Sequence, residues 1–211
     1  MNLTNIPKVK IIDYGIGNIW SVMSAFKYLG VEVEIVSDPE EISMSSILVL
    51  PGVGSFRKCM ESLMNSGIDK AVIEAVSNKD AKILGVCLGM QLMGSCSTED
   101  GKTKGLNLLP NRVEKFTSQE LNSKKVPHVG FDSINFDKKE GLFKDLPDMP
   151  DFYFTHSYRM LVEDLHGVYA TCKYGVEFLA AYQVNNICGT QFHPEKSQTN
   201  GLILLKNFIQ L

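Results

Sequence analysis

The chain of 211 residues is 44% hydrophobic and 21% charged, which are the proportions of a globular protein. This length suffices for one domain spanning residues 1–211, whose core needs no disulfide or metal for stability. The formal net charge of -3 excludes the strongly basic surface that nucleic acids and anionic membranes select. No apolar run reaches the ~20 residues of a membrane span, so we expect a cytoplasmic protein with no membrane or nucleic-acid partner.

Strand and helix patterns alternate in the first half of the chain. Asn18 precedes helically spaced apolar residues and is expected to cap that helix, which Gly30 ends. The strands are apolar on both faces, which is typical of a parallel sheet covered by helices on both sides. The expected elements are strand 9–13, helix 19–29, strand 31–36, strand 47–50, helix 60–76, strand 82–86 and helix 88–93.

The second half of the chain is dominated by short strand patterns that end in one helix, 202–208. Together the halves predict an α/β fold with a mostly parallel central sheet, helices on both faces and an antiparallel extension. The expected strands are 111–116, 126–131, 152–157, 167–172, 178–183 and 187–192, and the expected polar loops are 97–104, 117–125 and 137–150.

The sequence Gly85-Val86-Cys87-Leu88-Gly89 has the form of a nucleophile elbow between a strand and a helix. Such a turn lifts the nucleophile above the carboxyl end of the sheet, and its glycines avoid steric crowding. The positive end of the following helix favours the reactive thiolate, and the amide of Leu88 can donate to an oxyanion. We therefore predict that Cys87 is a nucleophile, whereas the other four cysteines are structural.

A base for this nucleophile is predicted at His193-Pro194-Glu195, directly after an expected strand. The imidazole can meet Cys87 if their strands are neighbours, and Glu195 can orient that imidazole as the third member of a triad. The four histidines form no HxH or HExxH motif and the cysteines no CxxC pair, so we expect no metal and no cofactor.

Two glycine-rich turns follow other apolar strands. In Pro51-Gly52-Val53-Gly54 the amide of Val53 is a candidate second oxyanion donor. The turn 13–18 lacks the third glycine of a dinucleotide fingerprint, so we interpret it as a turn near the carboxyl edge of the sheet that faces a partner.

Taken together, these motifs resemble the class I (triad) glutamine amidotransferases, over essentially the whole chain. Within that class the closest similarity is to the family of glutaminase subunits of imidazole glycerol phosphate synthase. The motifs that carry the resemblance are 13–18, 51–56, 85–93, 126–130, 153–158 and 189–197. One departure is the pair Phe131-Asp132, where the family usually has Trp-Asn.

The resemblance implies a glutaminase with the triad Cys87, His193 and Glu195, which passes ammonia to a (β/α)8 cyclase subunit within a heterodimer, in histidine biosynthesis. It also implies that glutamine is recognised by Gln91 and by backbone around three further residues, Gly52, His156 and Ser157. The partner is expected near Lys196 and near Asn18 of the first glycine-rich turn.

Three alternative functions stay open at this point. A paralogous glutaminase of this kind supplies ammonia to a sugar-amidating synthase for surface glycans, and Phe131-Asp132 leaves that branch open. An independent thiol hydrolase would place its acid far from its histidine, unlike the tight pair His193 and Glu195. A catalytically inactive binding subunit would not need an intact triad.

Overall fold

The computed structural model describes residues 8–163 and 165–211. An eight-stranded sheet forms its centre, in the order β2-β1-β3-β4-β14-β13-β12-β9. The strands are β1 (Lys8–Ile12), β2 (Glu32–Val36), β3 (Ile47–Gly52), β4 (Lys82–Cys87), β9 (Asn135–Phe136), β12 (Val168–Tyr174), β13 (Val176–Val184) and β14 (Ile187–Thr190).

The central sheet changes from parallel to antiparallel at β13. The pairs β1–β2, β1–β3, β3–β4 and β4–β14 are parallel, whereas β13 and β12 pair antiparallel with their neighbours. This confirms the predicted fold class, a mostly parallel sheet with an antiparallel extension. The parallel register sets Gly52 opposite Cys87, so the ends of β3 and β4 meet at one edge.

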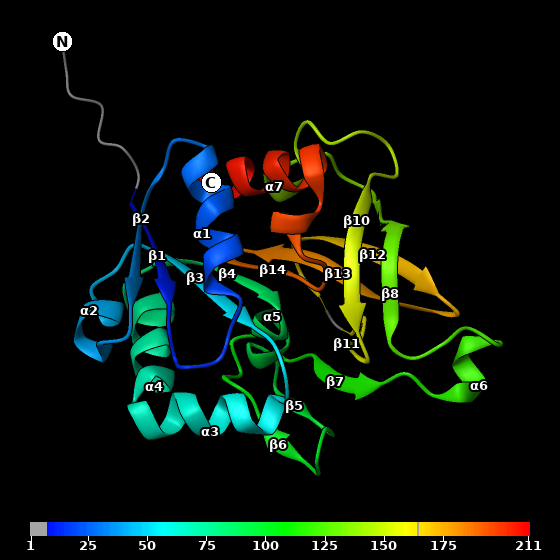
Figure 1. The fold of residues 1–211 in the computed structure, drawn as a ribbon, viewed down its shortest axis with the longest axis horizontal. Helices are drawn as coiled ribbons and strands as arrows, with labels where there is room; N and C mark the ends of the chain where they lie inside the picture. Colours follow the sequence, from blue (N-terminus) through cyan, green and yellow to red (C-terminus); the bar gives the residue numbers. More distant parts are fainter. Residues whose placement is uncertain (1–7, 164) are drawn as a thin grey trace.

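Helices cover both faces of this sheet, and Figure 1 shows α1 (Ile19–Tyr28) and α7 (Gln198–Gln210) together on one side. The opposite side carries α3 (Phe56–Ser66), α4 (Ile68–Ile73) and α5 (Leu88–Leu92). The strands are buried on both faces because neighbouring residues contribute to different cores. Leu84 packs with the α1 and α7 side, and Ile83 packs with the α3 side.

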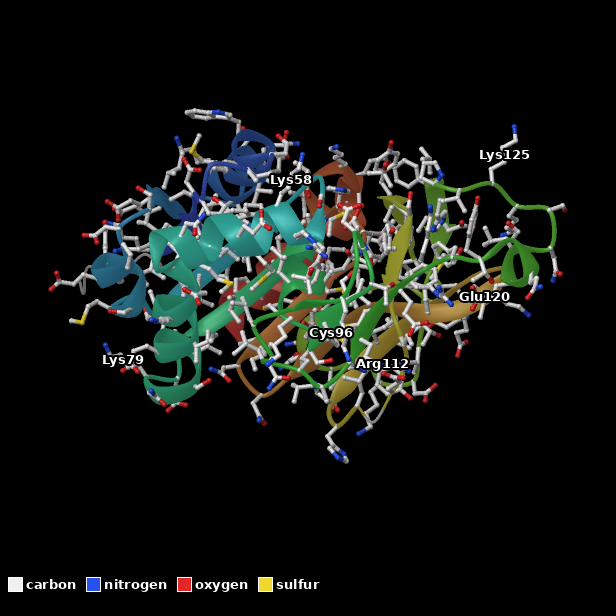
Figure 2. All side chains as sticks on the ribbon, turned by 90° about the horizontal axis from the view of Figure 1, so that it is seen from below. Lys58, Lys79, Cys96, Arg112, Glu120 and Lys125 are labelled. Carbon is white, nitrogen blue, oxygen red and sulfur yellow. The ribbon has the colours of Figure 1, made fainter. Side chains whose placement is uncertain are left out.

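Two small sheets adjoin the antiparallel end of the central sheet. One pairs β8 (His128–Ser133) with β10 (Asp151–His156), and these strands lie side by side in Figure 1. The other has the order β11-β7-β5-β6. Its strands are β5 (Cys96–Ser97), β6 (Thr103–Lys104), β7 (Arg112–Lys115) and β11 (Tyr158–Met160). Figure 2 labels Cys96 and Arg112, which are partners in the parallel pairing of β5 with β7.

Several expected elements differ from the structure in their boundaries. The helix expected over 60–76 is α3, α4 and the π-helical segment η1 (Glu74–Asn78), because Gly67 at φ 75° ends α3. The polar stretch 117–125 contains α6 (Ser118–Leu121), which a capping box between Thr117 and Glu120 stabilises. The remaining short elements are α2 (Pro39–Ser43), η2 (Gly141–Phe143) and η3 (Pro194–Lys196).

The predicted side-chain cap at Asn18 is wrong, although Asn18 does occupy the N-cap position of α1. Its Oδ1 accepts a hydrogen bond from the Ser21 hydroxyl at 3.1 Å, and its side chain caps no backbone amide. Among the residues that the structure describes, no helix has both the length and the apolar character needed to cross a membrane.

Candidate active site

Cys87 lies in a strained turn between β4 and α5. Its φ of 54° and ψ of -110° are unfavourable for a residue with a Cβ. The glycines on either side lie against backbone: a Cβ on Gly85 would lie 2.7 Å from the Met90 nitrogen. The predicted elbow is therefore present, and the strand–turn–helix geometry that the sequence indicates is the geometry observed.

His193 and Glu195 follow β14, the strand that pairs in parallel with β4. His193 Nδ1 lies 2.8 Å from Glu195 Oε1, and both side chains are almost completely buried. Cys87 lies on the other side of His193, close enough to raise the pKa of that imidazole, and both residues line the same cavity. The structure thus brings the three predicted triad residues together, with His193 hydrogen-bonded to Glu195 and next to Cys87.

The ionisation of His193 is set by its two neighbours. Burial by itself lowers the pKa of His193, but the hydrogen bonds and charges of Cys87 and Glu195 raise it to about 10. The imidazole therefore holds its second proton at neutral pH and can release that proton to a leaving group.

Further groups surround the sulfur of Cys87. Gln191 Nε2 donates to Cys87 Sγ at 3.8 Å, and Cys87 Sγ lies 3.9 Å from the Thr155 carbonyl oxygen. Gln191 is fully buried, and its Oε1 accepts from Gln91 Nε2 at 2.8 Å. Gln191 belongs to the resembled segment 189–197 but was not predicted as a site residue. A glutamine inside an apolar strand pattern is the signal that could have identified it.

A cavity of about 400 Å³ opens beside Cys87 and His193. It contains five of the six residues predicted to bind substrate, whereas Gly52 lies behind it, opposite Cys87. The lining residues are Val53, Gly54, Cys87, Leu88, Gln91, Glu99, Pro127, Thr155, His156, Ser157, Tyr158 and His193.

Glu99 is a cavity residue that the sequence pattern did not indicate, because it lies in the polar stretch 97–104, which has the composition of a surface loop. Its Oε2 accepts a hydrogen bond from the Phe56 amide at 2.7 Å, which ties the loop to the start of α3. Burial raises the pKa of Glu99, and the Phe56 amide opposes that rise. Glu99 places a carboxylate in the cavity wall.

Tyr14 packs against the end of β3, where the Pro51–Gly54 turn begins. The Tyr14 hydroxyl donates to the Pro51 carbonyl oxygen at 2.9 Å, and a Cβ on Gly52 would lie 3.0 Å from that hydroxyl. Cys59 Sγ donates to the Val53 carbonyl oxygen at 3.6 Å. These contacts hold the turn at the edge of the cavity, and donation by the Val53 amide to an oxyanion stays a prediction.

The two residues expected to face a partner lie on different elements. Lys196 is exposed on η3, and its Nζ lies 5.8 Å from the ring centre of Tyr153. The same ring makes an edge contact with Phe131 at 5.5 Å, and the Phe131 side chain is 49% exposed. Asn18 is partly buried at the start of α1. Exposed aromatic and basic side chains therefore lie together around Tyr153.

The site offers no cluster of side chains suited to a metal ion among the residues that the structure describes. Within residues 8–163 and 165–211, no group of three or more His, Cys, Asp or Glu side chains is placed to hold a metal ion. The chemistry available here is that of a cysteine thiol, an imidazole and two carboxyl groups beside a cavity.

Comparison with known proteins identifies the family. The family model for glutamine amidotransferase class-I matches residues 10–211. The imidazole glycerol phosphate synthase subunit HisH 1 of Parasynechococcus marenigrum (strain WH8102) is 44% identical, over 97% of this chain and 98% of its own. The HisH subunit of Moorella thermoacetica (strain ATCC 39073 / JCM 9320) is 42% identical, over 96% of this chain and 94% of its own.

A solved structure supports the fold alone. A crystal structure of a glutamine amidotransferase superposes with a TM-score of 0.73 at 19% identity, and the match covers 96% of this chain and 97% of that one. The family match and the two relatives extend over nearly the whole chain. The chain therefore belongs to the class-I glutamine amidotransferase family, and within it to the family of the HisH subunits of imidazole glycerol phosphate synthase.

Proposed function

We propose that this chain is a cytoplasmic glutaminase subunit of imidazole glycerol phosphate synthase, which hydrolyses glutamine to glutamate and ammonia for histidine biosynthesis. The observation that carries the proposal is the grouping of Cys87 with the hydrogen-bonded pair His193 and Glu195 beside a cavity of about 400 Å³. A thiolate next to an imidazolium is the arrangement that acyl transfer from an amide requires.

The reaction proceeds in two halves. The Cys87 thiolate attacks the side-chain carbonyl carbon of glutamine, and the resulting tetrahedral oxyanion collapses as the carbon–nitrogen bond breaks. The imidazolium of His193 gives its proton to the departing nitrogen, which leaves as ammonia. His193 then takes a proton from water, the hydroxide attacks the thioester, and glutamate leaves as the thiolate and the imidazolium reform.

The oxyanion needs donors that are already in place. The Leu88 amide is at the first position of α5, where no carbonyl of the same helix can accept from it. We propose this amide and the Val53 amide as the two oxyanion donors. Gly52 supports them from behind, since it lies opposite Cys87 in the register of β3 with β4.

The hydrogen bonds of Gln91 indicate how the α-ammonium group of the substrate glutamine is recognised. Gln91 Nε2 donates to the Tyr158 carbonyl oxygen and to Gln191 Oε1, both at 2.8 Å. Its Oε1 is then the atom that can meet a substrate, and it accepts only a donor such as the α-ammonium group. Glu99 supplies a carboxylate for the same ammonium, and backbone at His156 and Ser157 lines the wall of the cavity.

The product explains why such a chain functions with a partner. Ammonia is mostly protonated in water at neutral pH, and ammonium is not a nucleophile. We propose a heterodimer with a (β/α)8 cyclase that receives ammonia by a shielded route. Exposed Phe131 and Lys196, which both contact the Tyr153 ring, and Asn18 at the start of α1 are the proposed contacts.

The second candidate is the paralogous glutaminase of a sugar-amidating synthase. The observation that favours it is Phe131-Asp132 on β8, in place of the usual Trp-Asn, because Phe131 is exposed beside the proposed contacts. The test measures glutaminase activity of this chain alone, with the histidine-pathway cyclase and with the sugar-amidating synthase of the same cell.

We expect strong stimulation by the histidine-pathway cyclase and little activity of the isolated chain. The Pro51–Gly54 turn is the proposed control point, because an unformed oxyanion hole costs about 10²- to 10³-fold in rate. A liganded partner then favours the formed state by differential affinity. Stimulation by the sugar-amidating synthase alone would assign the chain to that pathway, and full activity without any partner would contradict this control.

A further inference from the structure

Three close polar contacts form a series from β8 to β11, outside the triad, and the two histidines in it are buried. Asp132 Oδ2 lies 2.7 Å from His128 Nε2, and His128 Nδ1 lies 3.0 Å from His156 Nε2. His156 Nδ1 then lies 2.8 Å from the Tyr158 carbonyl oxygen. The antiparallel register of β8 with β10 places His128 directly opposite His156, which is why the two rings meet.

The three contacts need more hydrogens than two neutral histidine rings can supply. Three hydrogen bonds need three hydrogens, whereas two neutral imidazoles supply only two. The Tyr158 carbonyl has none, and neither has an ionised Asp132. Whichever tautomers the two rings adopt, one contact of 2.7–3.0 Å would then join two bare acceptors. The geometry therefore requires a third proton.

The position of the third proton follows from burial. Burial lowers the pKa of His156 to about 3, so this ring is neutral and donates through Nδ1 to the Tyr158 carbonyl. His156 Nε2 must then accept from His128 Nδ1, and the remaining proton belongs to the contact between His128 and Asp132. Burial lowers the pKa of His128 overall, against the opposing hydrogen bond and charge of Asp132, so it is the geometry of the three contacts that assigns the third hydrogen to the pair.

We propose that the pair His128–Asp132 retains one proton at neutral pH, so that all three hydrogen bonds point toward the Tyr158 carbonyl. His128 and Asp132 are then positioning residues. This inference rests on the proposed function only for its kinetic consequence. It also gives a meaning to the departure at residue 132, because an Asn there would supply the third hydrogen through its own amide group.

The surroundings of His128 fit a ring that shares a positive charge. His128 is stacked between Tyr174, with ring centres 3.9 Å apart, and Phe154, at 4.8 Å. Aromatic faces stabilise a cation by their electron density. Lys124 Nζ lies 4.4 Å from the far side of Tyr174 and opposes that charge.

Other ionisable groups also lie near these three contacts. Burial raises the pKa of Cys172 to about 12, so this thiol near Asp132 is neutral. Arg159 and His193 both oppose a positive charge on His156. Lys125, labelled in Figure 2, points away from the ribbon into solvent. None of these groups can supply the missing hydrogen to the contact between His128 and Asp132.

The series of three contacts ends at the Tyr158 carbonyl, which belongs to the active site. The Tyr158 carbonyl oxygen accepts from His156 and also from Gln91 Nε2, at 2.8 Å each. Orienting this carbonyl orients Gln91, the proposed contact of the substrate ammonium. The ring of His156 packs against Phe116, Phe154 and Phe178, so the three contacts connect the cavity wall to the aromatic core.

Nuclear magnetic resonance on histidine-labelled full-length chain tests the proton directly. At neutral pH we expect a low-field proton resonance from the contact between His128 and Asp132, an Nδ1-protonated His128, and an Nδ1-protonated His156 with a bare Nε2. In Asp132→Asn the low-field resonance should disappear while both Nδ1 signals persist. A wild-type spectrum without that resonance, or with His156 protonated at Nε2, would overturn the proposal.

The kinetic arm measures KM and kcat for glutamine against pH in the complex with the stimulating synthase. In the wild type, loss of the shared proton at alkaline pH should raise KM about tenfold, the effect of one charge-assisted hydrogen bond. Asp132→Asn should show no such rise, because its amide hydrogen cannot be titrated. Asp132 is 39% exposed, so this variant should fold.

Asp137→Asn, at an exposed position, is the matched control and should keep the wild-type profile. An alkaline rise in KM that is equal in wild type and Asp132→Asn would overturn the positioning role. A complex that hydrolyses no glutamine would contradict the proposed function. The spectra do not depend on catalysis, so they would still test whether His128 and Asp132 share a proton.

Discussion

The backbone of Gly89 touches the backbone of Leu50: a Cβ built on Gly89 would lie 1.8 Å from the Leu50 carbonyl oxygen. This contact presses the first turn of α5 onto β3. It therefore fixes the distance between the turn that carries Cys87 and the turn that carries Gly52. A glycine is required here by close approach and not by an unusual φ.

The first prediction follows from this contact. In most helices a Gly→Ala change stabilises by about 1 kcal/mol, because alanine is the better helix former. Gly89→Ala should instead destabilise by more than about 3 kcal/mol, because β3 or α5 must move. Urea unfolding measures the difference in the free energy of unfolding.

Gly30→Ala is the matched control for Gly89→Ala. Gly30 has a φ of 76° and nothing within 4 Å of a built Cβ, so only backbone strain opposes the change. It should destabilise by about 1 kcal/mol. Equal losses for the two variants would show that the contact with Leu50 relaxes without cost.

The fold could be predicted from the sequence largely because its strands are apolar on both faces. The runs that became β3 and β4 left no exposed polar side, which excludes an open antiparallel arrangement. Helix boundaries were harder to predict, because the end of α3 depends on Gly67 at φ 75° within an otherwise continuous helical pattern. A capping box hides α6 in a stretch whose composition is that of a loop.

The candidate site was predictable where a motif carries its own geometry. The elbow around Cys87 and the two-residue spacing of His193 and Glu195 are local, so their arrangement is encoded within a few residues. Glu99 and Asp132 were not predictable as site residues in this way. Glu99 is placed by a hydrogen bond from the distant Phe56 amide, and the contact of His128 with His156, which extends the Asp132 pair, depends on the register of β8 with β10.

Replacing Cys87 with Ala should abolish glutamine hydrolysis, with a loss of at least about 10³-fold in kcat. The fold should survive, because Ala is smaller and occupies the same turn. The proposed complex should keep its activity with added ammonium salt, because the proposal places the synthase site on the other chain. Glutaminase and ammonium-dependent assays on the same preparation make the comparison, and normal glutaminase activity would show that another residue is the nucleophile.

The strain at Cys87 can be measured separately from its chemistry. Its φ of 54° is unfavourable for any residue with a Cβ, and Cys87→Ala keeps that strain. Cys87→Gly removes it, so the Gly variant should be more stable than the Ala variant by about 1 kcal/mol. Thermal unfolding of the two inactive variants measures this difference. A less stable Gly variant would mean that the turn is relaxed.

The members of the triad should differ in their importance. His193→Asn removes the proton carrier and should reduce kcat by several orders of magnitude, whereas Glu195→Gln removes only orientation and charge and should cost less. The matched control is Glu61→Gln on the exposed side of α3, which should leave kcat unchanged. A loss at Glu195 no larger than at Glu61 would contradict its role.

Glu120 would be an unsuitable control for this series. Although Figure 2 shows it on the outer part of the molecule, it forms an ion pair with buried Arg159 and closes the capping box of α6. Glu120→Gln is therefore expected to lower stability, which would confuse a comparison of kcat values.

The last prediction concerns stability in mild acid. The pKa of His156 is about 3 in the folded chain because of burial, against 6.5 in the unfolded chain. The unfolded state therefore binds a proton below pH 6.5 that the folded state does not bind. The stabilisation is fully present above pH 6.5 and is lost as pH falls toward 3. His193, whose pKa is raised to about 10, keeps its proton in the folded chain while the unfolded chain takes one up near pH 6.5, so it adds a smaller slope of opposite sign.

Between pH 7 and pH 5 the free energy of unfolding should fall by about 2 kcal/mol through His156 alone. Carboxylates contribute little above pH 5, and the slopes of the other histidines are common to wild type and variant, so the difference between the two isolates His156. Urea unfolding of wild type and His156→Gln at both pH values measures the difference, and exposed His166→Gln is the matched control that should keep the wild-type slope. If His156→Gln shows the full wild-type slope, His156 takes up its proton without unfolding and the wall behind Ser157 tolerates a charged ring.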